Sequence, residues 1–174
     1  YSQPPTCSNS HWFPWLSKQL MVHDIHTVAF EMPNSPYPVY EQWKREFERY
    51  DITPETILVG HSCGGGFLVR WLSEHPGVMA GNVILVAPWM GYDFGVPFDK
   101  SFFEFELDKL VASRTRKLAI MSSSNDFDAI KASIRFLQDN IANIKIINLG
   151  NKGHFCLSDM GTEAFPQLLD ECLA

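Results

Sequence analysis

Apolar and polar positions follow two rhythms along the chain, and these rhythms predict its secondary structure. Short apolar runs rich in β-branched residues are typical of strands, whereas apolar residues that recur every three or four positions are typical of helices. The expected strands are residues 25–32, 56–62, 83–89, 117–124 and 144–150. The expected helices are residues 11–23, 40–50, 63–75, 127–141 and 162–173.

Strands and helices therefore alternate from one end of the chain to the other. This order predicts an α/β fold, a three-layer sandwich with a mainly parallel sheet and helices on both faces. Within the run TILVGHS at 56–62, Ile57, Leu58 and Val59 form a continuous apolar stretch, as expected of a strand buried on both faces. Without an internal repeat or a linker, residues 1–174 are expected to form a single domain.

The segment 88–116 interrupts this alternation. It is rich in aromatic residues and too long for a simple connection, and we expect one short helix near 101–112. Its aromatic side chains could complete the core, or the segment could partly cover a substrate pocket. Trp89 and Phe94 are the candidates for lining such a pocket.

Composition narrows the class of protein. A net charge of −6 and a pI near 5.4 argue against nucleic-acid binding, and no apolar run is long enough to span a membrane. Four irregularly spaced cysteines form no metal-binding pattern, and nothing else in the sequence implies a metal or an organic cofactor. A reduced, cytoplasmic protein is favoured over one with two disulfides.

One short motif indicates chemistry. Gly60, Ser62 and Gly64 match G-x-S-x-G, directly after a predicted buried strand and at the start of a predicted helix. In that context the serine stands on a sharp turn above the sheet, and the residues two before and two after it are expected to be small. A phosphate-binding loop would need a lysine that is absent here. Ser62 is therefore the candidate nucleophile.

The partners of a nucleophilic serine follow in the order acid, then histidine, each after a later strand. His154 comes directly after the last predicted strand and is the candidate base. Asp126 and Asp128 both follow the strand 117–124, and either could instead cap the next helix. Asp126 is preferred as the acid.

The carbonyl oxygen of a substrate becomes negatively charged during attack and needs donors. The backbone N–H of Cys63 would be one donor, because it lies at the start of the helix after the nucleophile. The Cys63 thiol then has no chemical part.

With these residues identified, the chain resembles the small serine α/β-hydrolases of the retinoblastoma-binding protein 9 and YdeN type. The resemblance covers nearly the whole chain, and it rests on SNSHWFPWL, FEMPNSPYP, ILVGHSCGG, SSND and KGHF. It implies Ser62 as nucleophile, Asp126 as acid and His154 as base. Many members carry a second acid before that aspartate, where this chain has Asn125.

The resemblance also implies a strand that the sequence does not contain. Such proteins begin with a short apolar strand, which lies in the sheet between the segments corresponding to 25–32 and 56–62. We therefore expect residues upstream of Tyr1. The second oxyanion donor would come from them or from Tyr1 or Ser2.

The expected function is a serine hydrolase that cleaves small carboxylic esters or amides through an acyl-enzyme, with a small-molecule substrate and neither nucleic acid nor membrane as partner. Two alternatives stay open: a protein-binding module on a hydrolase scaffold, and an acyltransferase with the same three residues.

Overall fold

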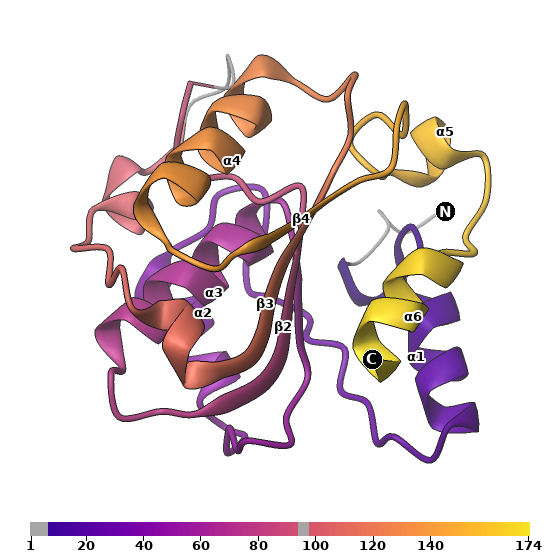
Figure 1. The fold of residues 1–174 in the computed structure, drawn as a ribbon, viewed down its shortest axis with the longest axis horizontal. Coiled ribbons are helices and arrows are strands. Elements are labelled where there is room, and N and C mark those ends of the chain that lie inside the picture. The colour runs from indigo at the N-terminus through magenta and orange to yellow at the C-terminus, as the bar shows by residue number, and fades with distance from the viewer. Residues whose placement is uncertain (1–6, 94–97) are drawn as a thin grey trace.

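A parallel four-stranded sheet forms the centre of the computed structural model, which describes residues 7–93 and 98–174 (Figure 1). The strands lie in the order β1 (Leu58–His61), β2 (Ala80–Val86), β3 (Thr115–Ser122) and β4 (Lys145–Asn148). The α-helices are α1 (Phe13–Val22), α2 (Tyr40–Phe47), α3 (Cys63–Glu74), α4 (Asp128–Asn140), α5 (Leu157–Met160) and α6 (Pro166–Leu173). Three 3-10 helices, η1 (Cys7–Asn9), η2 (Lys100–Phe103) and η3 (Val111–Arg114), complete the elements.

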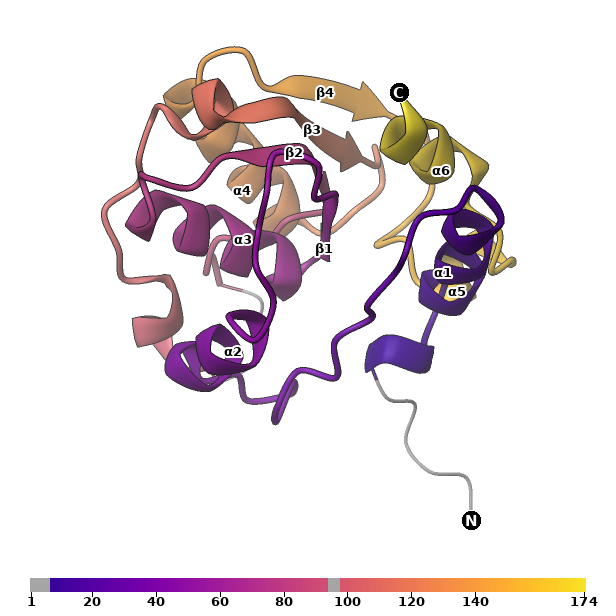
Figure 2. The same cartoon turned by 90° about the horizontal axis from the view of Figure 1, so that it is seen from below.

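Helices cover both faces of the sheet. α3 and α4 lie on one face with α2 beside α3, and α1 and α6 lie on the other (Figures 1 and 2). All residues of β2 are buried, as are the last five of β3, which explains why their sequences are almost entirely apolar. The predicted three-layer α/β-hydrolase-like sandwich is confirmed.

The described part of segment 88–116 packs into the core. Phe102 is 1% exposed, and its ring lies 5.2 Å from that of Trp43, centroid to centroid. The expected helix near 101–112 is wrong, because the chain forms η2 and η3 with irregular backbone between them. Arg70 donates from Nη1 to the carbonyl oxygens of Ser101 and Phe102, so these acceptors are satisfied without a continuing helix. Phe94 lies outside the described residues.

The expected strand at 25–32 is also wrong. The segment connects α1 to α2 as irregular backbone, set apart from β1 in Figure 2, and belongs to no strand of the sheet. A strand exists only where a neighbour accepts its backbone hydrogen bonds, and in the part of the chain described here β1 pairs with β2 alone. The short helix α5 was not expected from the sequence.

No helix among residues 7–93 and 98–174 combines the length and the apolar character that crossing a membrane requires.

Gly64 and Gly66, both in the first turn of α3, allow a test of how closely this helix packs against its surroundings. A Cβ at Gly66 would overlap the carbonyl oxygen of Trp89 and lie 2.6 Å from the Phe103 ring, whereas a Cβ at Gly64 would meet nothing within 4 Å. Gly66→Ala should therefore lower the free energy of unfolding by about 1–3 kcal/mol. Gly64→Ala should leave it unchanged or raise it by about 0.5–1 kcal/mol. Urea denaturation of both variants measures this, and equal effects would contradict the packing.

Candidate active site

Ser62 stands on a sharp turn between β1 and α3. Its φ of 53° and ψ of −118° are unfavourable for a residue with a side chain. Hydrogen bonds hold the turn in place: Ser62 N donates to Val86 O at 2.9 Å, and Ser62 O accepts from Trp89 N at 3.0 Å. The neighbouring strand β2 and the residues after it thus fix the backbone of the serine.

The glycines around Ser62 have different tasks. A Cβ at Gly60 would lie 2.6 Å from the carbonyl oxygen of Gly64, so residue 60 must lack a side chain. Gly64 itself has open space where its Cβ would be, and the expectation that this position must be small is wrong. The close approach after the serine occurs at Gly65, against Pro88, and at Gly66.

Residues from three distant segments meet at this turn. The Nε2 atom of His154 lies 2.9 Å from Ser62 Oγ, and its Nδ1 atom lies 2.9 Å from Asp126 Oδ1. Asp126 also accepts from the N–H of Phe127 at 2.7 Å, which orients the carboxylate toward the imidazole. His154 therefore lies between Asp126 and Ser62, within hydrogen-bonding distance of each.

The two aspartates after β3 differ sharply in environment. The Asp126 side chain is 0% exposed and faces His154. The Asp128 side chain is 100% exposed and pairs only loosely with Lys131, at 3.4 Å. With a carboxylate at Nδ1, the neutral imidazole carries its proton there, and Nε2 is left to accept the hydroxyl proton of Ser62.

The loop that carries His154 is tied down by contacts that the sequence did not reveal. Asn125 Oδ1 accepts from Gly153 N at 2.8 Å, and Asp159 Oδ2 accepts from His154 N at 2.9 Å. The His61 ring binds the other side of the loop, with Nε2 donating to His154 O at 2.8 Å. In the sequence, the only sign that these residues hold the loop is that Asn125 lies next to Asp126 and His61 next to Ser62.

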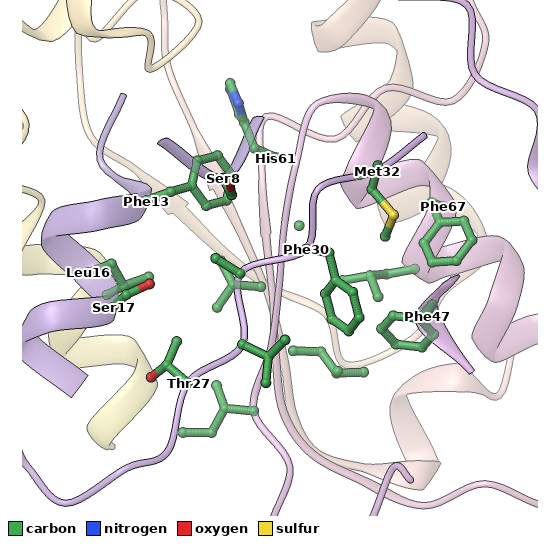
Figure 3. Close-up of a pocket in the computed structure, with 18 of the residues that line it drawn as sticks. Ser8, Phe13, Leu16, Ser17, Thr27, Phe30, Met32, Phe47, His61 and Phe67 are labelled. Atoms are coloured by element: carbon green, nitrogen blue, oxygen red, sulfur yellow. The ribbon is translucent and has the colours of Figure 1, made fainter. Parts of the chain in front are cut away.

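Ser62 is among the residues that line a groove of about 740 Å³ beside β1. Figure 3 shows Phe13 and Leu16 on one side of the groove and Phe47 and Phe67 on the other. We call it the β1 groove; its lining includes Phe13, Leu16, Thr27, Phe30, Phe47, Val59, His61 and Phe67. Trp89 does not line it: the residue is 8% exposed, and its indole N–H donates to the Tyr92 carbonyl. A part for Trp89 in a substrate pocket stays a prediction.

Cys63 begins α3, so its N–H lies at the N-terminal end of that helix. Its part as an oxyanion donor stays a prediction, and Tyr1 and Ser2 lie outside the described residues. Among residues 7–93 and 98–174, no three His, Cys, Asp or Glu side chains lie close enough together to hold a metal ion.

Comparison with known proteins identifies the family. The sequence profile of the serine hydrolase family matches residues 6–172. The chain belongs to this family. It is 30% identical over 172 residues to YdeN of Bacillus subtilis (strain 168), a hydrolase by name, and the match covers 94% of this chain and 87% of YdeN. The predicted likeness to YdeN is confirmed, and the likeness to retinoblastoma-binding protein 9 stays a prediction.

Solved structures show the same fold. The crystal structure of YdeN superposes on this serine hydrolase with a TM-score of 0.79 at 24% identity, over 94% of this chain and 89% of that one. Est1E from Butyrivibrio proteoclasticus gives a TM-score of 0.62 at 12% identity, over 100% of this chain and 86% of that one.

His61 is the titratable neighbour of this site that is most altered by folding. Burial lowers the pKa of its imidazole from the ordinary value of 6.5, and the nearby His154 lowers it further. Aromatic rings surround it: the Trp12 centroid lies 5.8 Å away and that of Phe13 lies 6.5 Å away. His61 is therefore held neutral, which suits its contact with the His154 carbonyl.

This shift makes the stability of the serine hydrolase depend on pH. Unfolded His61 takes up a proton as the pH falls below 6.5, whereas folded His61 resists it. The free energy of unfolding should thus decrease between pH 6.5 and pH 4, by on the order of 1 kcal/mol per pH unit from this residue. His61→Gln keeps a donor for the His154 carbonyl but cannot titrate, so this decrease should become shallower. The exposed His26 offers a matched control: His26→Gln should keep the full slope in urea melts, and equal slopes for both variants would contradict the assignment.

Proposed function

We propose that this serine hydrolase cleaves small carboxylic esters or amides through an acyl-enzyme formed on Ser62. The row of contacts from Asp126 through His154 to Ser62, 2.9 Å at each step, is the observation that carries this proposal. A serine hydroxyl is a weak nucleophile until a base accepts its proton, and this row supplies the base and orients it.

In the first half of the reaction, His154 Nε2 takes the proton from Ser62 Oγ as this oxygen attacks the substrate carbonyl. A bond forms between Oγ and the carbonyl carbon, and the carbonyl oxygen becomes an oxyanion. The N–H of Cys63, at the N-terminal end of α3, stabilises this charge. Asp126 stabilises the imidazolium of His154, which then protonates the leaving alcohol or amine.

In the second half, water replaces the leaving group. His154 Nε2 removes a proton from the water while its oxygen attacks the acyl carbon, and the bond to Ser62 Oγ breaks as the serine regains its proton. The carboxylic acid leaves, and water is the only co-substrate. Expulsion of an amine requires more help from the general acid than expulsion of an alcohol, so esters are the first substrates to test.

Active-site labelling tests whether Ser62 is activated. We expect a fluorophosphonate probe to add once to the native protein, at Ser62, because His154 makes its oxygen nucleophilic. Ser62→Ala should abolish the adduct and His154→Ala should slow labelling by about 10⁴-fold or more. Intact-protein mass spectrometry measures both, with Ser113→Ala, a serine on η3, as the control that keeps full labelling. A folded native protein without an adduct would overturn the proposed function.

The two aspartates after β3 provide a matched pair for the acid. Asp126→Asn should lower kcat for a p-nitrophenyl ester by about 10⁴-fold, because an amide in place of the carboxylate leaves His154 with the wrong tautomer for a base. Asp128→Asn removes the same charge at a fully exposed position and should leave kcat unchanged. If the two variants behaved alike, Asp126 would not be the acid.

A further inference from the structure

A second cavity lies toward the opposite edge of the sheet from β1. It has a volume of about 290 Å³ and is lined by one face of α4 and by residues at the carboxyl ends of β3 and β4. Among the described residues, none that lines this cavity also lines the β1 groove, and Ser62, Asp126 and His154 are not part of its lining. We call it the α4 cavity. Its volume suits a small molecule.

Two positively charged side chains line the α4 cavity. Lys131 and Arg135 lie four residues apart, so they share one face of α4, where like charges repel each other. Lys131 Nζ contacts the carboxylate of Asp128 only loosely, at 3.4 Å, and Arg135 makes no ion pair within residues 7–93 and 98–174. None of the lining residues is acidic, although the chain has 20 Asp and Glu residues and a net charge of −6. The α4 cavity is therefore a positively charged site in an acidic protein.

The side-chain amide of Asn148, the last residue of β4, is oriented by its neighbours. Its Oδ1 atom accepts from Gly150 N at 2.8 Å and from Ser124 Oγ at 3.2 Å. Both bonds use the oxygen, which identifies the other end of the amide as the NH₂ group. Within the part of the chain that the structure describes, this Nδ2 group has no acceptor. Asn148 therefore adds hydrogen-bond donors, and no negative charge, to the lining.

A buried hydroxyl adds to these donors at the end of β3. Ser122 is only 7% exposed, and its Oγ makes one long contact with the carbonyl oxygen of Ile147, at 3.4 Å. A hydrogen bond of that length is weak, so the hydroxyl can bond to a better acceptor. Ile134 and Ile146 supply apolar surface beside it. The α4 cavity thus combines positive charge and donors with a small apolar wall.

We propose that the α4 cavity binds a small organic anion, with a phosphate, phosphonate or carboxylate group on a small apolar body. The oxyanion would lie between Lys131 and Arg135, because a guanidinium donates two parallel hydrogen bonds to such a group. The amide of Asn148 would donate to the same group, and the apolar body would contact Ile134 and Ile146. A neutral ligand would leave the two positive charges uncompensated, and a cation would be repelled.

Three ligands that share or lack one feature test this chemistry. Benzylphosphonate carries both the oxyanion and an apolar body, methylphosphonate lacks the ring, and benzylamine has the same ring with a positive charge. NMR titration of the full chain should show saturable shifts of the Asn148 side-chain amide and the Ser124 backbone amide with benzylphosphonate. Methylphosphonate should bind about fivefold or more weakly, because it buries less apolar surface, and benzylamine should not shift these signals.

Two double variants that remove the same charge locate the binding. Lys131→Gln with Arg135→Gln should raise the Kd for benzylphosphonate about tenfold or more, because both charged donors are lost. Lys18→Gln with Arg45→Gln removes two positive charges at exposed positions outside the cavity and should leave the Kd unchanged. Ser62→Ala should also bind normally, so this test does not depend on the proposed function.

Three results would overturn the proposal. The first is the absence of saturable shifts at Asn148 and Ser124 up to about 20 mM benzylphosphonate, a concentration that reveals even weak binding. The second is equal binding of benzylphosphonate and benzylamine, which would show that charge plays no part. The third is an equal loss of affinity in the two double variants, which would show that only the net charge of the protein matters.

Discussion

The backbone of Ser62 is the constraint on which the other parts of the site depend. Its carbonyl oxygen accepts from the N–H groups of Trp89, Gly65 and Gly66, and its own N–H bonds to Val86. These bonds join β1, α3 and the end of β2 at one residue, and they stabilise a φ that a serine would otherwise avoid. The hydroxyl is consequently presented by three elements at once, and a change in the packing of α3 against Trp89 would move it.

The candidate base, His154, is held in place in a different way. His154 lies in a loop, where backbone groups are free to move unless side chains bind them. Asn125, Asp159 and His61 each bind the backbone of that loop, within 2.8–2.9 Å. Regular secondary structure therefore positions Ser62, whereas side-chain hydrogen bonds from residues far apart in the sequence position His154.

This difference explains what the sequence could and could not predict. The strand before Ser62 and the residues that lie beside it, Asp126 and His154, were accessible, because they follow from apolar runs and from chain order. The contacts of Asp159 and Asn125 were not, since they depend on tertiary structure. Segment 25–32 shows the same limit: its residues suit a strand, but strand formation requires a neighbour that local sequence does not encode.

β1 itself shows how the edge of this sheet differs from an ordinary one. Exposed edge strands usually carry a charge, a proline or a bulge that prevents pairing with other chains. The strand Leu-Val-Gly-His has none of these, and its apolar residues are those of a strand enclosed by neighbours. Among residues 7–93 and 98–174, β1 pairs with β2 alone, and Ser62 at its end is held by hydrogen bonds to Val86 and Trp89. The pairing of β1 and the position of Ser62 are therefore physically linked.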